Sequence, residues 1–424
     1  METIVIIVLC ILLLLAYVFD ITSRWTKIPS VILLLLSGWI IQQLMTFLSL
    51  KVPDLSPILP ILGTIGLILI IMESSFDLKL HKSKISLINK SFLGALFPMI
   101  MLAFFLAFLF SSLKGYSFIN SLINAIPFCI ISSAIAIPSI KHLPEEEREF
   151  IIFESSLSDI LGILFFNFIT LNTVFNLNTF GRFGLDILIM LVISLIATVG
   201  LAFLLNKIKH HVKFFPIILL IVLIYAVFKV FHLPGLVFIM IFGLSLANLD
   251  KIKQIPRLMN VDTAVLEKEI VKFKELTAEA TFMIRASFFL LFGFLIKTEE
   301  IFNLPSLAYS FIIVASIILF RIIQLKISRL PLIPLLFVAP RGLISILLFL
   351  SIIPAQSIPL VNRPMVIQVV LLSALTMMVG LILTKEPHGE QTIINEPETP
   401  TPNGEQMIIE ETEETEEPQN QVEQ

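Results

Sequence analysis

The chain has 424 residues, of which 57% are hydrophobic and only 14% are charged, whereas a soluble domain is about 25% charged. With a mean hydropathy of +0.98, it has too little polar surface to cover a globule in water. The composition excludes nucleic-acid binding, secreted disulfide scaffolds and ordinary soluble enzymes, and it predicts an all-α polytopic membrane protein.

Apolar runs of membrane-spanning length recur along the chain with short polar breaks between them. A transmembrane helix needs about 20 predominantly apolar residues. Thirteen such runs lie at 3–20, 28–50, 56–76, 88–112, 117–140, 148–171, 184–206, 214–231, 233–249, 276–297, 305–325, 332–355 and 363–384. They predict about 13 transmembrane helices within one membrane domain over residues 1–384.

Two of these runs, 117–140 and 332–355, are interrupted by helix-breaking and polar residues. The interruptions are Pro127, Ser132, Ser133 and Pro138 in the first run, and Pro334, Pro340 and Gly342 in the second. A broken helix is tolerated inside a membrane only where it faces protein or a water-filled cavity. The two runs therefore predict discontinuous helices at a transport site.

The basic residues predict which loops lie in the cytoplasm. An odd number of spans places the termini on opposite sides, and most loop Lys and Arg residues lie on the side of the C-terminus, for example within 79–90 and 251–274. Basic loops remain cytoplasmic, so the N-terminus is expected outside and the C-terminus inside. The longest loop, 250–275, is expected to lie on the membrane surface as an amphipathic helix.

The last segment, 385–424, differs in kind from the rest of the chain. All 29 Lys and Arg residues lie at or before Lys385, and the residues beyond it are rich in Glu, Pro, Thr and Gln. Such a segment cannot bury enough apolar surface to offset the entropy of ordering it. We expect a disordered, acidic cytoplasmic tail.

Six charged residues fall inside predicted spans, and they are the strongest functional signal in the sequence. They are the acids Glu73, Glu154 and Asp159 and the arginines Arg285, Arg321 and Arg341. Each charge at the centre of a bilayer costs roughly 2.5–3.5 kcal/mol on insertion scales. A chain that carries six must pair them or use them in transport.

Two of the acids belong to one polar cluster with the sequence FESSLSD at 153–159. On a helix, Glu154 shares a face with Ser158, and Ser155 shares a neighbouring face with Asp159. Alkali cations prefer hard oxygen ligands, so the Ser155–Asp159 stripe suits such a cation. Glu154 suits an arginine partner equally well, and the residues alone leave open that both acids only bridge helices.

Four segments together resemble the monovalent cation:proton antiporter superfamily, most closely its electroneutral sodium/proton exchanger branch. The segments are MESSFDL at 72–78, SSAIAIPSIKHL at 132–143, ESSLSDILGI at 154–163 and APRGLISILLFL at 339–350. Each is weak alone, but their order and spacing are specific. The likeness covers residues 1–384 and leaves the tail outside.

The resemblance implies inverted repeats, two crossed discontinuous helices and a homodimer. It makes Asp159 the carboxylate that carries either a cation or a proton. Glu73, Ser155 and Ser132 become further ion ligands. Glu154 and Arg321 become a structural ion pair that holds the core together.

Four positions depart from the family pattern or modulate it. Ser133 replaces the acid of the family's Thr-Asp-Pro segment, which removes a charge from the crossing. Ser158 stands where electroneutral members have Asn, and it joins the expected ion-binding residues. Arg285 resembles a basic position of some electrogenic relatives, and Arg341 lies in the second crossing segment.

These observations predict a secondary antiporter that exchanges Na+ for H+, with Li+ also accepted and a ratio of one to one. It needs no cofactor, since its ions are substrates, and it is expected in a bacterial inner membrane. The nearest alternative is a K+/H+ antiporter or K+ efflux protein, because all these cations take oxygen ligands. The second is a transport-degenerate sensor or scaffold that acts through the acidic tail. Nothing in the sequence indicates an enzyme.

Overall fold

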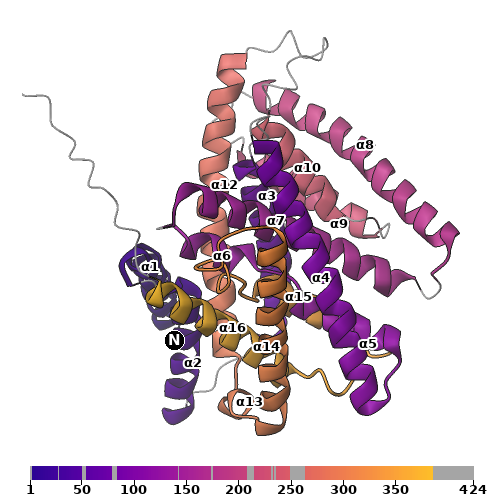
Figure 1. Cartoon of the computed structure of the whole chain (residues 1–424). Helices are drawn as coiled ribbons and strands as arrows, with labels where there is room; N and C mark the ends of the chain where they lie inside the picture. Colours follow the sequence, from indigo (N-terminus) through magenta and orange to yellow (C-terminus); the bar gives the residue numbers. More distant parts are fainter. Residues whose placement is uncertain are drawn as a thin grey trace, which may run out of the picture. The chain divides into compact units, whose positions relative to one another are not determined.

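The computed structural model describes residues 2–26, 28–49, 54–78, 84–141, 143–172, 175–207, 214–230, 233, 235–248 and 263–384. Every regular element within these ranges is helical (Figure 1). The tail predicted at 385–424, and with it the proposed domain boundary, lies outside them. So does the first half of the loop at 250–275.

The helices follow the predicted apolar runs in chain order. They are α1 (Glu2–Thr26), α2 (Ser30–Phe47), α3 (Ile58–Asp77), α4 (Ile85–Lys114), α5 (Phe118–Ala125), the 3-10 helix η2 (Ile126–Phe128), α6 (Ser133–Ser139), α7 (Glu145–Leu171), α8 (Leu177–Lys207), α9 (Phe214–Val230), α10 (Gly235–Ala247), α12 (Thr263–Phe294), α13 (Thr298–Ile301), α14 (Leu304–Ile327), α15 (Leu343–Ser351) and α16 (Arg363–Leu383). Within the described chain, eight helical segments are long and apolar enough to cross a membrane, the α5–α6 segment among them. The all-α polytopic architecture is confirmed.

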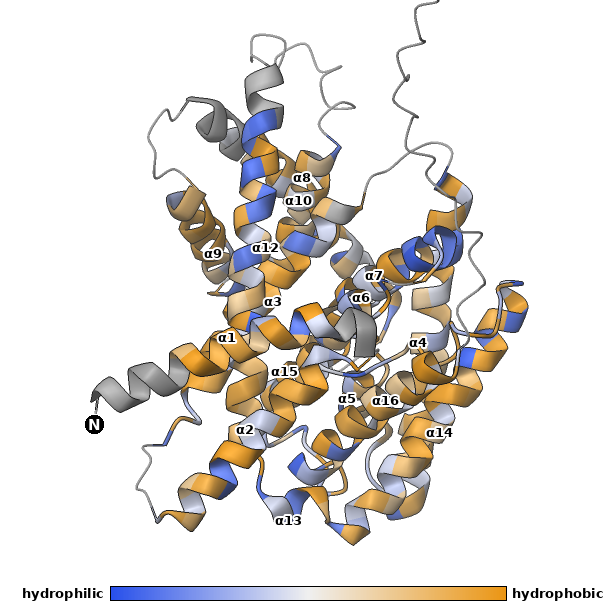
Figure 2. Cartoon of the chain, turned by 90° about the vertical axis from the view of Figure 1, so that its left-hand side faces the viewer, coloured by the Kyte–Doolittle hydropathy of each residue, from blue (hydrophilic) through white to orange (hydrophobic). Residues whose placement is uncertain are grey.

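One element is longer than the sequence predicts. The surface helix expected over 250–275 is wrong for residues 263–275, because they form the first turns of α12, which runs unbroken to Phe294. No Gly or Pro interrupts the stretch between Thr263 and Phe292, and its Ala, Leu, Glu and Lys residues favour a helix. Figure 2 shows hydrophilic residues in the coloured turns near the start of α12.

The helices pack as two groups. In the core group, α4 packs against α5, α7 and α14, and α14 packs against α16. In the panel group, α2 and α3 pack against α12, and α10 packs against α3, α8 and α9. Helix α3 joins the two groups, since it also contacts α6, α7 and α15 of the core.

The packing repeats when each helix is replaced by the one that lies seven spans away in the chain. The α2–α12 pair corresponds to α10–α3, and the α4–α7 pair corresponds to α14–α16. Because seven is odd, equivalent helices cross the membrane in opposite directions, as inverted repeats do. The broken spans that contain α6 and α15 are also seven apart and are equivalent in this scheme.

Candidate functional site

The two interrupted runs meet at their non-helical residues. Cys129–Ser132 separates η2 from α6, and Ala339–Gly342 precedes α15 without helical structure. The two segments are joined where the Ser132 backbone N–H donates to the Pro340 carbonyl over 2.9 Å. They form a crossing of two discontinuous helices, with backbone groups freed from helical hydrogen bonding.

Gly342 allows the two crossing segments to approach this closely. A Cβ at this position would lie 2.6 Å from Ser132 Oγ and 2.7 Å from Ile135 Cδ1. We expect Gly342→Ala to lower stability by about 1–3 kcal/mol, the usual effect of overpacking, and to lower exchange activity. Thermal unfolding in detergent measures the first effect. Gly181→Ala, where a Cβ meets nothing within 4 Å, is the matched control; an equal loss in both variants contradicts the close packing.

Asp159 lies on α7 directly beside this crossing. Its side chain is 2% exposed, and its Oδ2 accepts hydrogen bonds from the Ser133 hydroxyl and, over 3.4 Å, from the Ser133 backbone N–H. Ser133 is the first residue of α6, so this N–H is one that the helix leaves unpaired. Ser133 removes an acid from the family pattern, and here it orients the carboxylate of Asp159 instead.

Three buried oxygen atoms, on Asp159 and on one serine each of α7 and the first crossing segment, have no hydrogen-bond partner among the described residues. They are Asp159 Oδ1, Ser132 Oγ and Ser156 Oγ. Buried polar atoms are normally paired, and Ser156 is only one turn before Asp159 on α7. Oxygens left unpaired in this way are suited to a cation that takes several oxygen ligands.

The other two serines of the cluster are already engaged. Ser155 Oγ donates to the Ile151 carbonyl over 2.7 Å, which is the back-bonding common for serines within helices. Ser158 Oγ accepts from the Ile131 backbone N–H over 3.0 Å, so it fastens the first crossing segment to α7. Glu73 is half-buried on α3, and α3 packs against both α6 and α7.

Glu154 and Arg321 lie together in the core group, away from solvent. Arg321 Nη1 donates to Glu154 Oε1, and Gln324 also donates to that oxygen while accepting from Arg321 over 2.9 Å. Arg321 Nε donates to the Leu335 carbonyl over 3.1 Å. Arg321 therefore connects α7 and α14 to the residues that precede the second crossing segment, Ala339–Gly342.

Arg341 occupies the crossing itself, whereas Arg285 does not join this cluster. Arg341 Nε donates to the Phe128 carbonyl over 2.6 Å, at the end of η2, and Nη1 donates to the Ala339 carbonyl over 2.7 Å. A guanidinium suits that position because a helix C-terminus carries partial negative charge. Arg285 is half-buried on α12 and forms no hydrogen bond or ion pair with the part of the chain that the structure describes.

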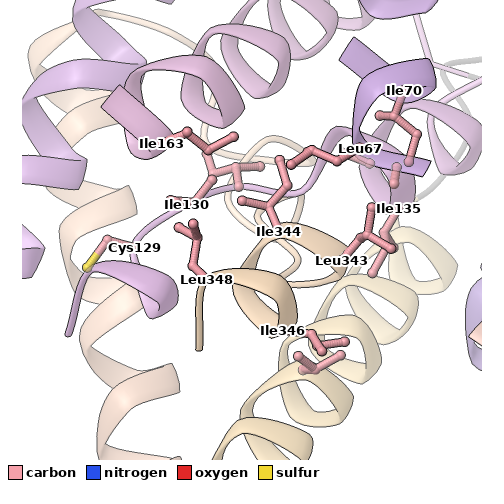
Figure 3. Close-up of a cluster of buried hydrophobic side chains, with 14 of the residues drawn as sticks. Leu67, Ile70, Cys129, Ile130, Ile135, Ile163, Leu343, Ile344, Ile346 and Leu348 are labelled. Carbon is pink, nitrogen blue, oxygen red and sulfur yellow. The ribbon is translucent and has the colours of Figure 1, made fainter. Parts of the chain in front are cut away.

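A cavity of about 420 Å³ lies between helices of the core group and helices of the panel group. Core helices α7 and α15 and panel helices α3, α9 and α10 line it, and its polar lining includes Asn167, Tyr225 and Lys229. Its apolar lining includes Leu67, Ile163 and Leu348, and Figure 3 shows these side chains in one buried cluster with Ile130 and Ile344. This apolar cluster lies close to Asp159 along α7, since Ile163 is one turn after Asp159 on that helix.

Comparison with known proteins identifies the family of the chain. The model of the sodium/hydrogen exchanger transmembrane family matches residues 9–385. The chain belongs to the sodium/hydrogen exchanger family. Its members are ion transporters and not enzymes, so the predicted resemblance and the class of activity, cation/proton antiport, are confirmed.

Solved structures agree with this fold. The chain is similar to the sodium proton antiporter MjNhaP1 from Methanocaldococcus jannaschii at pH 8, with a TM-score of 0.63 and 19% identity over 89% of this chain and 100% of that chain. A second structure, an electron-microscopy map of the same antiporter, gives a TM-score of 0.64 and 18% identity over 90% of this chain and 95% of that chain. No curated protein sequence matches the exchanger chain.

Sequence reasoning missed two residues of this region, Ser156 and Gln324. Ser156 adjoins Ser155 in the same polar cluster, but the four-residue spacing on a helix pairs Ser155, and not Ser156, with Asp159. Gln324 is three residues after Arg321, which places both on one face of α14. An uncharged amide inside a predicted span was the available signal.

Proposed function

We propose that this exchanger moves one Na+ in one direction for each H+ in the other, with Asp159 as the shared carrier. The observation that carries the proposal is the buried Asp159 carboxylate beside the crossed helices. Its Oδ2 is held by Ser133, and its Oδ1 has no partner among the residues that the structure describes. The similarity to a sodium proton antiporter supports Na+ as the cation.

The mechanism follows from the cost of a bare charge in an apolar seal. A lone carboxylate is expensive to move through the membrane interior, whereas one neutralised by a proton or a cation is not. The core group therefore changes its position against the panel only when Asp159 is occupied. This rule prevents the empty carrier from cycling and couples the two fluxes.

One carboxylate supports an electroneutral ratio. Glu154 is already neutralised by Arg321, and Ser133 stands in place of a second acid at the crossing. Asp159 is therefore the acid at the crossing that exchanges one positive charge, Na+ or H+, for the other. We propose Asp159 Oδ1, Ser156 Oγ and Ser132 Oγ as Na+ ligands, with Glu73 and Ser155 contributing as the family resemblance implies.

The serine ligands give a direct comparison within one helix. We expect Ser156→Ala to raise the Na+ concentration for half-maximal exchange several-fold, since each unpaired ligand oxygen contributes about 1 kcal/mol or more. We expect Ser155→Ala to have the smaller effect, because its hydroxyl also bonds Ile151. Na+-driven proton flux in vesicles measures both, and the reverse order contradicts the assignment of Ser156.

The ion and the ratio are tested together in proteoliposomes. Purified full-length exchanger is reconstituted with a pH-sensitive dye inside, and Na+, Li+ or K+ is added in turn with the membrane potential clamped. Proton flux driven by Na+ and unaffected by the potential is the expected result. Flux driven by K+ alone would favour K+/H+ exchange, and flux that follows the potential would reject a one-to-one ratio.

The membrane setting is also part of the proposal. We place the exchanger in a bacterial inner membrane as a homodimer, with the N-terminus outside and the C-terminus in the cytoplasm. The bias of basic loops supports this orientation. Reporter fusions at Met1 and at Gln424 test it, and an active cytoplasmic reporter at Met1 would reverse it. Cross-linking of the purified protein in vesicles tests the dimer, and a monomer that transports would reject it.

A further inference from the structure

A groove on the outer side of the core group has no role in the transport mechanism. It has a volume of about 500 Å³ and lies between α4 and α14, which neighbour each other in Figure 2. Phe97 and Met101 of α4 and Ile327 of α14 line it and are 57%, 52% and 77% exposed. Both helices are membrane-span candidates, so the groove opens toward lipid.

The groove is polar at one end and apolar along the rest of its length. Lys90, in the second turn of α4, and Ser328, which caps the end of α14, line the polar end. From Lys90 to Met101 the helix rises roughly 16 Å at 1.5 Å per residue. That is about half the hydrocarbon thickness of a bilayer, and thus the depth of one leaflet.

The charge at the polar end is not satisfied within the described chain. Lys84, the residue directly before α4, pairs with Glu149, but Lys90 forms no ion pair with any described residue. Arg329 directly follows Ser328 and forms none either. An anion is therefore the complementary group for this end of the groove.

We propose that the groove binds one phospholipid with an anionic headgroup. The headgroup phosphate lies at Lys90 and Ser328, and an acyl chain follows the apolar wall from Leu93 to Met101. Basic pockets between membrane helices on the cytoplasmic side bind such headgroups, and the loop charges place Lys90 on that side. The bound chain also covers Gln324, which lines the groove and donates to Glu154.

Tryptophan fluorescence in vesicles measures lipid selectivity at this surface. The two native tryptophans, Trp25 and Trp39, are replaced by Phe, and one reporter is introduced as Phe97→Trp. The full-length protein is reconstituted into equal mixtures of phosphatidylglycerol and phosphatidylcholine, with bromine on the acyl chains of one lipid or the other. We expect brominated phosphatidylglycerol to quench the groove reporter more strongly, with a preference of about fivefold, the contribution of one basic residue near a membrane surface.

Matched variants separate a site from general lipid contact. Phe108→Trp reports on the same helix outside the groove, and it should be quenched equally by both lipids. Lys90→Gln should abolish the preference at position 97, whereas Lys114→Gln, at the other end of α4, should leave it. Equal quenching at position 97, or the same preference at position 108, would overturn the proposal. The fluorescence measurement does not depend on transport, so it tests the lipid site independently of the exchange mechanism.

Discussion

Asp159→Asn should reduce cation-driven proton flux to the level of protein-free vesicles while leaving the exchanger folded. The amide oxygen of Asn still accepts the hydrogen bonds that Ser133 donates to Asp159 Oδ2, so the crossing keeps its geometry. An amide, however, can neither carry a proton nor neutralise a cation. The variant resembles a permanently neutral carrier that has nothing to exchange.

The measurement is Na+-driven proton flux in proteoliposomes, together with the thermal unfolding midpoint of the same preparation. The control is Asp186→Asn, the same change at an exposed acid on α8, which should keep wild-type flux. Cation-driven exchange that survives in a folded Asp159→Asn protein would exclude this residue as the carrier. Loss of flux in the Asp186 variant would show that removing any acid is sufficient.

The helical architecture could be predicted because it depends on properties that are local in sequence. The number of apolar runs that are long enough to span a membrane gives the number of spans. The prolines and Gly342 mark the breaks in two of these runs, and these breaks form the crossing. The surface helix at 250–275 failed for its second half because charge marks where the membrane ends and does not mark where a helix ends. A Gly or Pro would interrupt the helix, and none lies between Thr263 and Phe292.

The choice of oxygens within the site could not be predicted from spacing. Ser155, Ser156 and Ser158 all lie within one turn or so of Asp159, and their roles depend on the rotation of α7 against its neighbours. Ser158 accepts from the Ile131 backbone N–H, Ser155 donates to the Ile151 carbonyl, and Ser156 has no hydrogen-bond partner in the described ranges. These differences arise from tertiary contacts with the crossing, which one sequence does not display.

Arg321→Met should destabilise the exchanger by about 3–5 kcal/mol, the usual effect of breaking a buried ion pair from one side. Arg321 is 3% exposed and Glu154 is fully buried. Within the described chain, the variant leaves a carboxylate in the core with a hydrogen bond from the Gln324 amide alone. The carbonyls of Leu335 and Val338 also lose their donor. The thermal unfolding midpoint in detergent should therefore fall by several degrees.

The double variant Glu154→Gln with Arg321→Met tests whether the unpaired charge of Glu154 causes the loss of stability in Arg321→Met. Because it removes both charges, it should be more stable than Arg321→Met alone, a non-additivity expected for residues in direct contact. The unfolding midpoint should not return to the wild-type value, because the carbonyls of Leu335 and Val338 still lack the hydrogen bonds from Arg321. Arg285→Met removes an arginine that has no ion pair in the described chain, and it should change the midpoint little. The single variant Glu154→Gln completes the comparison. If the stability losses of the two single variants add up to that of the double variant, the charges of Glu154 and Arg321 do not hold α7 and α14 together.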